Sequence, residues 1–267
     1  MHKITPKKKF GQNFLTDQSV IERIVSSAGQ LENKSILEIG GGSGNLTKHL
    51  IKAKPKDLIV VEIDKDYVEI LGKILQSSSV KTKLISENIL KTDIYSYFSE
   101  PPVIFGNLPY NISTKILAKL LGPSNDKNKW EKLFLLFQLE VANRIVAKPN
   151  TKQYGRLSLF SQFYSFPSLE FKIPKTSFFP IPKVESALVK FQSNYKYYHK
   201  HNSALFRDII KKSFQGRRKM IKNSLKTTYK NITELMAISD IPENSRPENI
   251  TLQQFCRLTD TIDKLCN

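Results

Sequence analysis

The feature of this sequence that most constrains its fold is a regular alternation of short apolar runs with helix-like patterns. The runs have the length and the branched-residue content of buried β-strands. They fall at residues 35–39, 58–62, 83–85, 103–105 and 132–139. Alternation of this kind predicts an α/β fold, a Rossmann-like, doubly wound parallel sheet covered by helices on both faces. Ahead of the sheet, Asp17 is expected to open a helix that ends at Gly29.

The composition changes near residue 193, and this change predicts a second domain. Residues 157–166 and 187–191 are the last stretches that resemble strands. After a linker rich in tyrosine and histidine, only helical patterns follow, at residues 204–214, 219–228, 232–237 and 251–266. We therefore expect an α/β domain over residues 1–194 and a small all-α domain over residues 195–267.

The chain carries a formal net charge of +18, which favours a polyanionic partner. No apolar run approaches the roughly 20 residues of a membrane span, so nucleic acid is preferred to a membrane. Between residues 196 and 230, Asp208 is the only acid, whereas a solvated helix face would mix both signs. The residues expected to contact RNA phosphates are Lys7, Lys8, Lys9, Arg217, Arg218, Lys219 and Lys222.

The cysteines and histidines form no metal-ligand pattern. Cys256 and Cys266 make no Cys-x-x-Cys pair, and the four histidines are scattered along the chain. We therefore expect no bound metal and a reducing compartment. The N-terminal segment has no hydrophobic signal core, so the sequence predicts a cytoplasmic protein. We expect it to act as a monomer without a membrane partner.

A glycine-rich turn follows the first strand and predicts a cofactor site. Gly40 and Gly42 let the backbone approach a ligand closely, and Asn45 stands where a dinucleotide-binding turn has its last glycine. Glu38 supplies an acid near a cationic group, which suits the ammonium of S-adenosylmethionine better than a pyrophosphate. Glu62, at the end of the second strand, is expected to accept the ribose hydroxyls. A nicotinamide or flavin cofactor and a merely solvated Glu62 are the less favoured alternatives.

The run Asn107-Leu108-Pro109-Tyr110 follows the fourth strand and suits alkyl transfer to the exocyclic amine of a flipped-out base. The lone pair of an adenine amine is delocalised into the ring, so the amine is a poor nucleophile. The Asn107 side-chain oxygen and the Leu108 carbonyl can accept hydrogen bonds from its two N–H groups and so favour a tetrahedral nitrogen. Pro109 stiffens the turn, Tyr110 offers a stacking face, and Phe178 is expected on the opposite face of the base. The simpler alternatives are a proline-containing turn and a loop that packs its phenylalanines into the core.

Together these motifs resemble the ribosomal RNA adenine dimethyltransferase family over nearly the whole chain. The matching segments are Gln-Asn-Phe-Leu at 12–15, Glu-Ile-Gly-Gly-Gly-Ser-Gly-Asn-Leu-Thr at 38–47, Asn-Leu-Pro-Tyr at 107–110, Phe-x-Pro-x-Pro-Lys-Val-x-Ser at 178–186 and Arg-Arg-Lys at 217–219. The resemblance is strongest to the small-subunit enzymes. It implies a class I methyltransferase that uses S-adenosylmethionine to dimethylate two adjacent adenosines in the 3′-terminal hairpin of small-subunit rRNA, within an assembling 30S particle. The residues that it implies at the cofactor are Asn13, Leu15, Gly40, Glu62, Asn88 and Asn107.

Position 88 departs from the family pattern, which usually has an acid there. The Asn88 oxygen can accept the same hydrogen bond from the cofactor's adenine amine but adds no charge, so cofactor affinity is expected to fall somewhat. Glu87 is an alternative ligand.

Three other functions stay open at this stage. One is a large-subunit rRNA adenine methyltransferase of the antibiotic-resistance type, which shares the catalytic motifs. Another is an RNA-binding ribosome-assembly factor without essential catalysis, which the intact glycine turn and the intact 107–110 turn disfavour. The last is a DNA adenine methyltransferase, which usually carries an acid in place of Asn107.

Overall fold

The computed structural model describes residues 12–122, 129–194, 199–216 and 219–266. Contacts divide the chain into two compact units: the first contains Met1–Ala142 and Ser168–Ser193, and the second contains Asn143–Pro167 and Asn194–Asn267. The boundary predicted after residue 194 differs from this division, because residues 143–167 group with the C-terminal helices.

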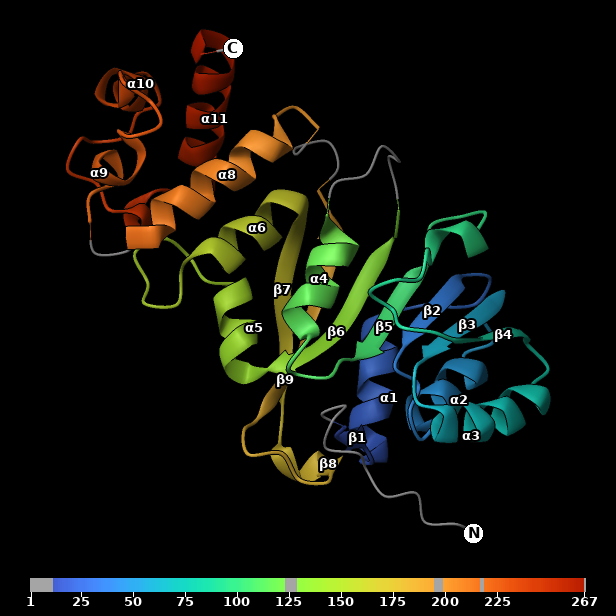
Figure 1. Cartoon of the computed structure of the whole chain (residues 1–267). Coiled ribbons are helices and arrows are strands. Elements are labelled where there is room, and N and C mark those ends of the chain that lie inside the picture. The colour runs from blue at the N-terminus through green and yellow to red at the C-terminus, as the bar shows by residue number, and fades with distance from the viewer. Residues whose placement is uncertain (1–11, 123–128, 195–198, 217–218, 267) are drawn as a thin grey trace. The chain divides into compact units, whose positions relative to one another are not determined.

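The first unit is built on a mixed sheet that, in the described part of the chain, has seven strands in the order β4-β3-β2-β5-β6-β9-β7 (Figure 1). The strands are β2 Ser35–Ile39, β3 Asp57–Glu62, β4 Lys81–Ser86, β5 Val103–Asn107, β6 Lys132–Gln138, β7 Ser165–Ile173 and β9 Ser186–Ser193. Strands β2 to β6 are parallel, whereas β9 pairs with β6 in antiparallel sense. The predicted Rossmann-like sheet is confirmed, with the antiparallel β9 as an addition. Because β3 and β5 lie on opposite sides of β2, the strand order reverses there, and ligands bind beyond the carboxyl ends of strands at such a point.

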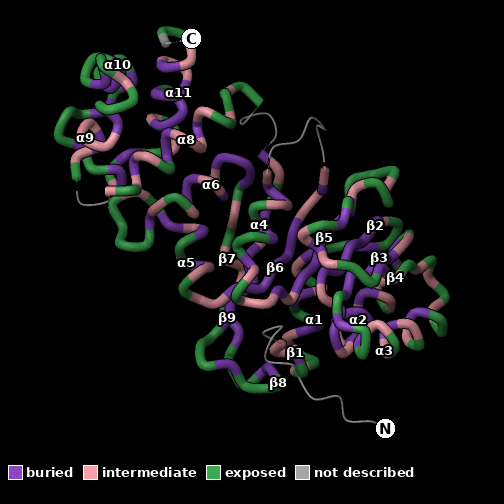
Figure 2. Tube along the Cα trace, viewed as in Figure 1, coloured by how far each residue is buried: buried purple, intermediate pink, exposed green. Residues whose placement is uncertain are grey.

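Amphipathic helices connect the strands. The helical spacing of the apolar residues in these segments predicts them. They are α1 Gln18–Ser27, α2 Asn45–Lys52, α3 Lys65–Gln76, α4 Ser113–Leu121 and α5 Leu139–Ile145. Asp17 caps α1 as predicted, since its Oδ1 accepts the Ser19 N–H at 3.1 Å. The central strands between these helices are buried (Figure 2), and Phe105 of β5 stacks on Phe134 of β6 with ring centroids 5.3 Å apart. This buried apolar core holds the strand ends in fixed positions.

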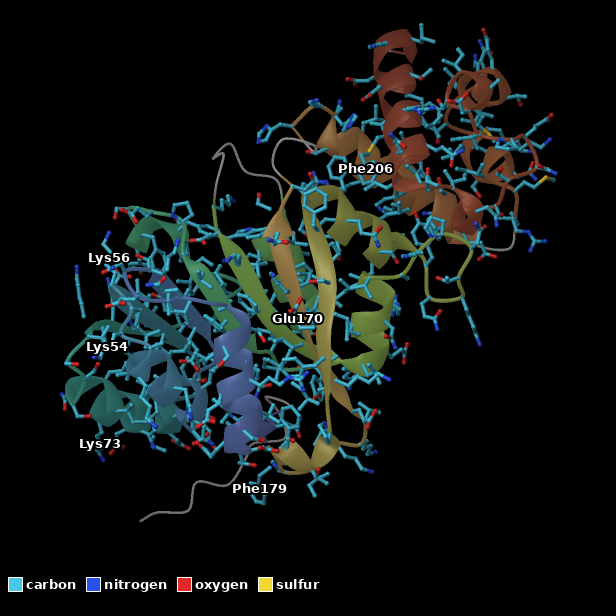
Figure 3. The ribbon with its side chains drawn as sticks, turned by 180° about the vertical axis from the view of Figure 1, so that it is seen from behind. Lys54, Lys56, Lys73, Glu170, Phe179 and Phe206 are labelled. Atoms are coloured by element: carbon cyan, nitrogen blue, oxygen red, sulfur yellow. The ribbon has the colours of Figure 1, made fainter. Side chains whose placement is uncertain are left out.

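A short antiparallel ribbon joins the N-terminal segment to the segment before β9. It pairs β1 Phe14–Leu15 with β8 Phe178–Phe179, with Leu15 opposite Phe178 and Phe14 opposite Phe179. Successive side chains of a strand point to opposite faces. Leu15 and Phe178 are accordingly buried in the core, whereas Phe179 is 61% exposed and projects from the end of the ribbon (Figure 3).

The second unit is helical, with α6 Arg156–Tyr164, α8 Ser203–Ser213, α9 Ile221–Leu225, α10 Ile232–Ile238 and α11 Leu252–Cys266. The four C-terminal helices are confirmed, but the strand predicted at residues 157–166 is wrong, because most of that segment forms α6. The segment is rich in apolar and aromatic residues, as a buried strand is, yet it forms a helix that stacks Phe163 on Phe206 with ring centroids 4.0 Å apart. None of the described helices is both long and apolar enough to cross a membrane.

Candidate active site

A cavity of about 300 Å³ opens where β2, β3 and β5 end, next to the reversal of strand order. Its walls come from the segment before β1, the turn after β2, the end of β3 and the turns after β4 and β5. The predicted site residues that line it are Asn13, Gly40, Glu62, Asn88, Asn107, Leu108, Pro109 and Tyr110. Segments that are up to about a hundred positions apart in the sequence therefore meet in one place that can hold a small organic ligand.

The glycine turn gives the cavity a wall of bare backbone. Gly40 has a φ of +75°, and a β-carbon at this position would meet only the Asn107 carbonyl oxygen, at 3.7 Å. Gly42 has a φ of +49°, and a β-carbon there would lie 2.7 Å from the ring of Phe14. The left-handed φ favours glycine at both positions, and at Gly42 the ring of Phe14 also leaves no room for a β-carbon.

The Glu62 carboxylate ties the glycine turn to the end of β3. Its Oε2 accepts the Gly42 N–H at 3.0 Å, and its Oε1 accepts the N–H groups of Ile63 and Asp64 at 2.8 and 2.9 Å. A carboxylate offers about four lone-pair sites, so Glu62 keeps capacity for a donor from a ligand. This side chain is both part of the cavity wall and a structural anchor.

Glu38 lies behind the glycine turn, 1% exposed, and does not line the cavity. Within the described part of the chain, its Oε2 has no hydrogen-bond partner. Burial raises the pKa of the Glu38 carboxyl to about 7; the Thr47 hydroxyl opposes this shift, and the charge of Glu62 adds to it. Glu38 therefore titrates near neutral pH.

Glu38→Gln is expected to flatten the dependence of stability on pH. Because the pKa is raised from 4.5 to about 7, the folded protein holds this proton more tightly than the unfolded chain does. The wild-type free energy of unfolding should therefore fall as pH rises through that window. A glutamine cannot ionise, so the variant should gain stability relative to wild type from pH 5 to pH 8, as measured by urea unfolding. A constant difference across that range would contradict the prediction.

The Asn107 side chain is oriented by the backbone of Asn13. Its Nδ2 donates to the Asn13 carbonyl oxygen at 2.8 Å. A carbonyl can only accept, so this contact fixes which end of the amide is the donor. The Oδ1 is then the end of Asn107 that remains to accept a hydrogen bond from a ligand. Leu108 and Pro109 follow in the cavity wall, and the Tyr110 hydroxyl lies 2.6 Å from Ser186 Oγ.

Asn88 lines the cavity with a side chain that already makes one contact. Its Oδ1 accepts the Leu90 N–H at 2.9 Å, an interaction that holds the turn after β4. The second lone pair of that oxygen can still accept a donor from a ligand. Glu87, the alternative ligand, also lines the cavity.

The structure does not bring every predicted residue to the cavity. Leu15, Glu38, Gly42 and Phe178 are absent from its lining. The expectation that Phe178 stacks on a base is corrected, because its side chain is 2% exposed and lies in the hydrophobic core. Alternation along β8 exposes its neighbour Phe179 instead. Leu15 is buried likewise, and its carbonyl oxygen accepts from Asn45 Nδ2 at 2.8 Å.

Some lining residues were not predicted from the sequence. Gln12 donates to Asp64 Oδ2 at 3.0 Å, Phe14 packs on the glycine turn, and Ile63 is 44% exposed. Each adjoins a residue that was predicted, so inclusion of sequence neighbours would have found them. Ser186 does not line the cavity; it ends the 178–186 segment that carries the resemblance, but its contact with Tyr110 spans 76 positions and was not predicted.

The basic residues expected to contact RNA are described only in part. Lys7, Lys8, Lys9, Arg217 and Arg218 lie outside the described residues. Lys219 is exposed, whereas Lys222 Nζ pairs with Glu243 Oε1 at 2.5 Å. That pairing lowers the net positive charge that Lys222 presents.

Known proteins resemble this chain along almost its entire length. A family model described as ribosomal RNA adenine dimethylase matches residues 3–264. The ribosomal RNA small subunit methyltransferase A of Pelagibacter ubique is 36% identical over 262 residues, which are 98% of this chain and 98% of the relative. The protein of the same name from Dinoroseobacter shibae is 34% identical over 261 residues, 98% of this chain and 93% of the relative.

Two solved structures have similar folds. A dimethyladenosine transferase from Plasmodium falciparum matches with a TM-score of 0.78 and 21% identity, covering 94% of this chain and 98% of that one. The 23S rRNA methyltransferase ErmE matches with a TM-score of 0.71 and 22% identity, covering 94% and 99%. At these identities the likeness establishes the fold alone.

Proposed function

This chain belongs to the ribosomal RNA adenine dimethylase family and is therefore an rRNA adenine dimethyltransferase, and we propose that it dimethylates the N6 amines of two adjacent adenosines in the 3′-terminal hairpin of small-subunit rRNA. The predicted family, its class I methyltransferase fold and its likeness to KsgA, the small subunit methyltransferase A, are confirmed. The observation that carries the proposed chemistry is the Asn107 amide, held by Asn13 with its Oδ1 left to accept from a substrate amine.

S-adenosylmethionine is the methyl donor in this proposal, and three features of the cavity support it. Gly40 offers bare backbone for close approach, Glu62 keeps a lone-pair site for a ribose hydroxyl, and Asn88 can accept from an adenine amine. These residues would hold the cofactor. When bound, it would supply a methyl carbon activated by a positively charged sulfur.

The chain's own contribution to the reaction is to bind, orient and polarise the target amine. Asn107 Oδ1 and the Leu108 carbonyl accept hydrogen bonds from the two N–H groups of the amine and favour a tetrahedral nitrogen, whose lone pair is no longer delocalised into the ring and is nucleophilic. Tyr110 stacks on the base, and Pro109 fixes the turn between these groups. A dedicated general base is unnecessary, since the proton can leave to water after the new bond has formed.

The small subunit is the proposed source of the substrate because both curated relatives described above carry that subunit in their names. We place the substrate in an assembling 30S particle, and the enzyme in the cytoplasm as a monomer with a role in small-subunit biogenesis. The large-subunit alternative has one observation in its favour, the fold shared with the 23S rRNA methyltransferase ErmE.

Methylation of the two purified ribosomal subunits tests the proposal. Small and large subunits lacking the modification are incubated separately with the protein and labelled S-adenosylmethionine, and the modified adenosines are mapped by primer extension. We expect two adjacent modified adenosines near the 3′ end of the small-subunit rRNA. Label confined to the large-subunit rRNA would favour the alternative, and no label in either would argue against catalysis.

Charge reversal at Arg217 and Lys219 is expected to weaken rRNA binding and to reduce its dependence on salt. Each lost phosphate contact removes roughly 0.7–0.9 from the slope of log affinity against log salt concentration, the values for single strands and for B-form duplexes. Filter binding between 50 and 300 mM KCl measures both quantities, and calorimetry should show unchanged cofactor affinity. Lys73→Glu, on an exposed α3 lysine paired with Glu69, is the matched control. An unchanged salt slope in the double variant would show that the basic residues at 217–219 form only a solvated surface.

A further inference from the structure

Tyr110 is held at both ends by serine hydroxyl groups from two other elements. Its phenol oxygen lies 2.6 Å from Oγ of Ser186, the first residue of β9. Its carbonyl oxygen accepts from Oγ of Ser113, the first residue of α4, at 3.1 Å. Both serines are buried, at 0% and 1% exposure, so water does not compete readily for these contacts. The ring is therefore fixed at its far end as well as through the backbone.

Ser186 is attached to the same sheet that carries Asn107. It lies opposite Gln138 in the antiparallel β6–β9 ladder. Strand β6 in turn pairs with β5, where Leu136 lies opposite Asn107. Two ladders of backbone hydrogen bonds thus set the distance between the anchor of the Tyr110 ring and the group proposed to hold the target amine.

We propose that Ser186 is a positioning residue for methylation: its hydroxyl orients the Tyr110 ring so that the stacked base presents its amine to Asn107. This inference rests on the proposed stacking role of Tyr110. A tyrosine ring in a cavity wall can rotate about its two side-chain torsions, and stacking is productive only in a narrow range of ring positions. The bond to a buried hydroxyl on a strand fixes the far end of the ring, and with it the first side-chain torsion, before the substrate arrives.

A purely structural role for Ser186 makes different predictions. If its hydroxyl served only to stabilise β9, its loss would lower stability and would be independent of Tyr110. If it positions the ring, its loss should affect the methylation step and should have no further effect once the Tyr110 hydroxyl is gone. A double-mutant cycle between Ser186→Ala and Tyr110→Phe separates these cases.

The cycle is measured as single-turnover methylation of small subunits at saturating S-adenosylmethionine. Ser186→Ala and Tyr110→Phe should each be slower by roughly 2- to 12-fold, the range for loss of one hydrogen bond. The double variant should be no slower than the slower single variant. The affinity for the subunit and for S-adenosylmethionine should stay within about twofold of wild type. Ser193→Ala, at the other end of β9, is the matched control and should match the wild-type rate.

A second readout follows the ring directly. A hairpin RNA with 2-aminopurine at one target adenosine reports stacking, because an aromatic neighbour quenches its fluorescence; the probe lacks the N6 amine, so it isolates stacking from the contacts with Asn107 and Leu108. Quenching is compared between saturated complexes, because the flipped base also leaves its RNA neighbours; we expect strong quenching in the complexes of wild type and Ser193→Ala, and weaker quenching in those of Ser186→Ala and Tyr110→Phe. This signal does not depend on the methyl-transfer step and does not change with a small loss of global stability.

The outcomes separate this inference from the proposed function. If wild type neither methylates small subunits nor quenches the probe, the proposed function fails. If wild type does both, additive rate effects or wild-type quenching in the Ser186→Ala variant overturn the positioning role. If Ser186→Ala does not fold, Tyr110→Phe removes the same bond from the cavity side, and its rate and quenching decide alone.

Discussion

Asn107→Ala is expected to slow single-turnover methylation by about 10²–10³-fold, the cost of removing one preorganised polar group that acts on the reacting atoms. The variant keeps β5, Pro109 and Tyr110 in place, so the affinity for rRNA should stay near its wild-type value. The contact between Asn107 Nδ2 and Asn13 is lost as well, but it lies on the donor side of the amide and touches no substrate atom. The loss should therefore appear in the rate and not in binding.

Two further variants make this test specific. Asn107→Asp keeps an acceptor for the amine but turns a carboxylate oxygen towards the Asn13 carbonyl, so it should fall between alanine and wild type. Asn111→Ala removes an exposed amide at the edge of the same cavity and should have a far smaller effect. Near-normal methylation by Asn107→Ala would mean that the amine is held elsewhere, and the site would have to be abandoned.

Much of the first unit could be predicted because its strands obey simple rules. Buried parallel strands such as β2 and β5 are short apolar runs that end in turns, and the chemistry-bearing residues follow directly after them. Asn107 and Glu62 could therefore be placed at one edge of a sheet without coordinates. The strand that was wrongly predicted lies in the second unit: residues 157–166 are rich in apolar and aromatic residues like a buried strand, but most of them form a helix whose Phe163 stacks on Phe206.

Two properties of the site could not be predicted. One is the face of a strand on which a residue lies, and the other is contact between residues that are far apart in the sequence. Phe178 and Phe179 are equivalent by composition, and only the register of β8 with β1 decides which one is buried. The side chain of Glu62 was predicted to accept the ribose hydroxyls, but its contacts with three backbone N–H groups depend on where the glycine turn lies in space. Ser186 ends a segment that matches the family pattern, but its contact with Tyr110 depends on the pairing of β9 beside β6.

Glu62→Ala is expected to weaken S-adenosylmethionine binding by roughly 1.5–3 kcal/mol, the range for a hydrogen bond to a charged group. This corresponds to a loss of about 10- to 150-fold in affinity. The structure adds a second cause, because the Gly42 N–H also loses its acceptor and the glycine turn is no longer tied to β3. Calorimetry measures the affinity, and urea unfolding of the cofactor-free protein measures the accompanying loss of stability.

Glu62→Gln separates the two causes. The glutamine oxygen can still accept backbone N–H groups on one side, but its amide nitrogen would face a donor on the other. We therefore expect part of the stability to return while cofactor affinity stays well below wild type, since the charge is absent. Glu69→Ala, which removes an exposed acid of α3 from its pair with Lys73, should change neither quantity by more than a few tenths of a kcal/mol. Wild-type affinity in Glu62→Ala would remove this residue from the cofactor site, and the ribose would then need another acceptor along the cavity wall.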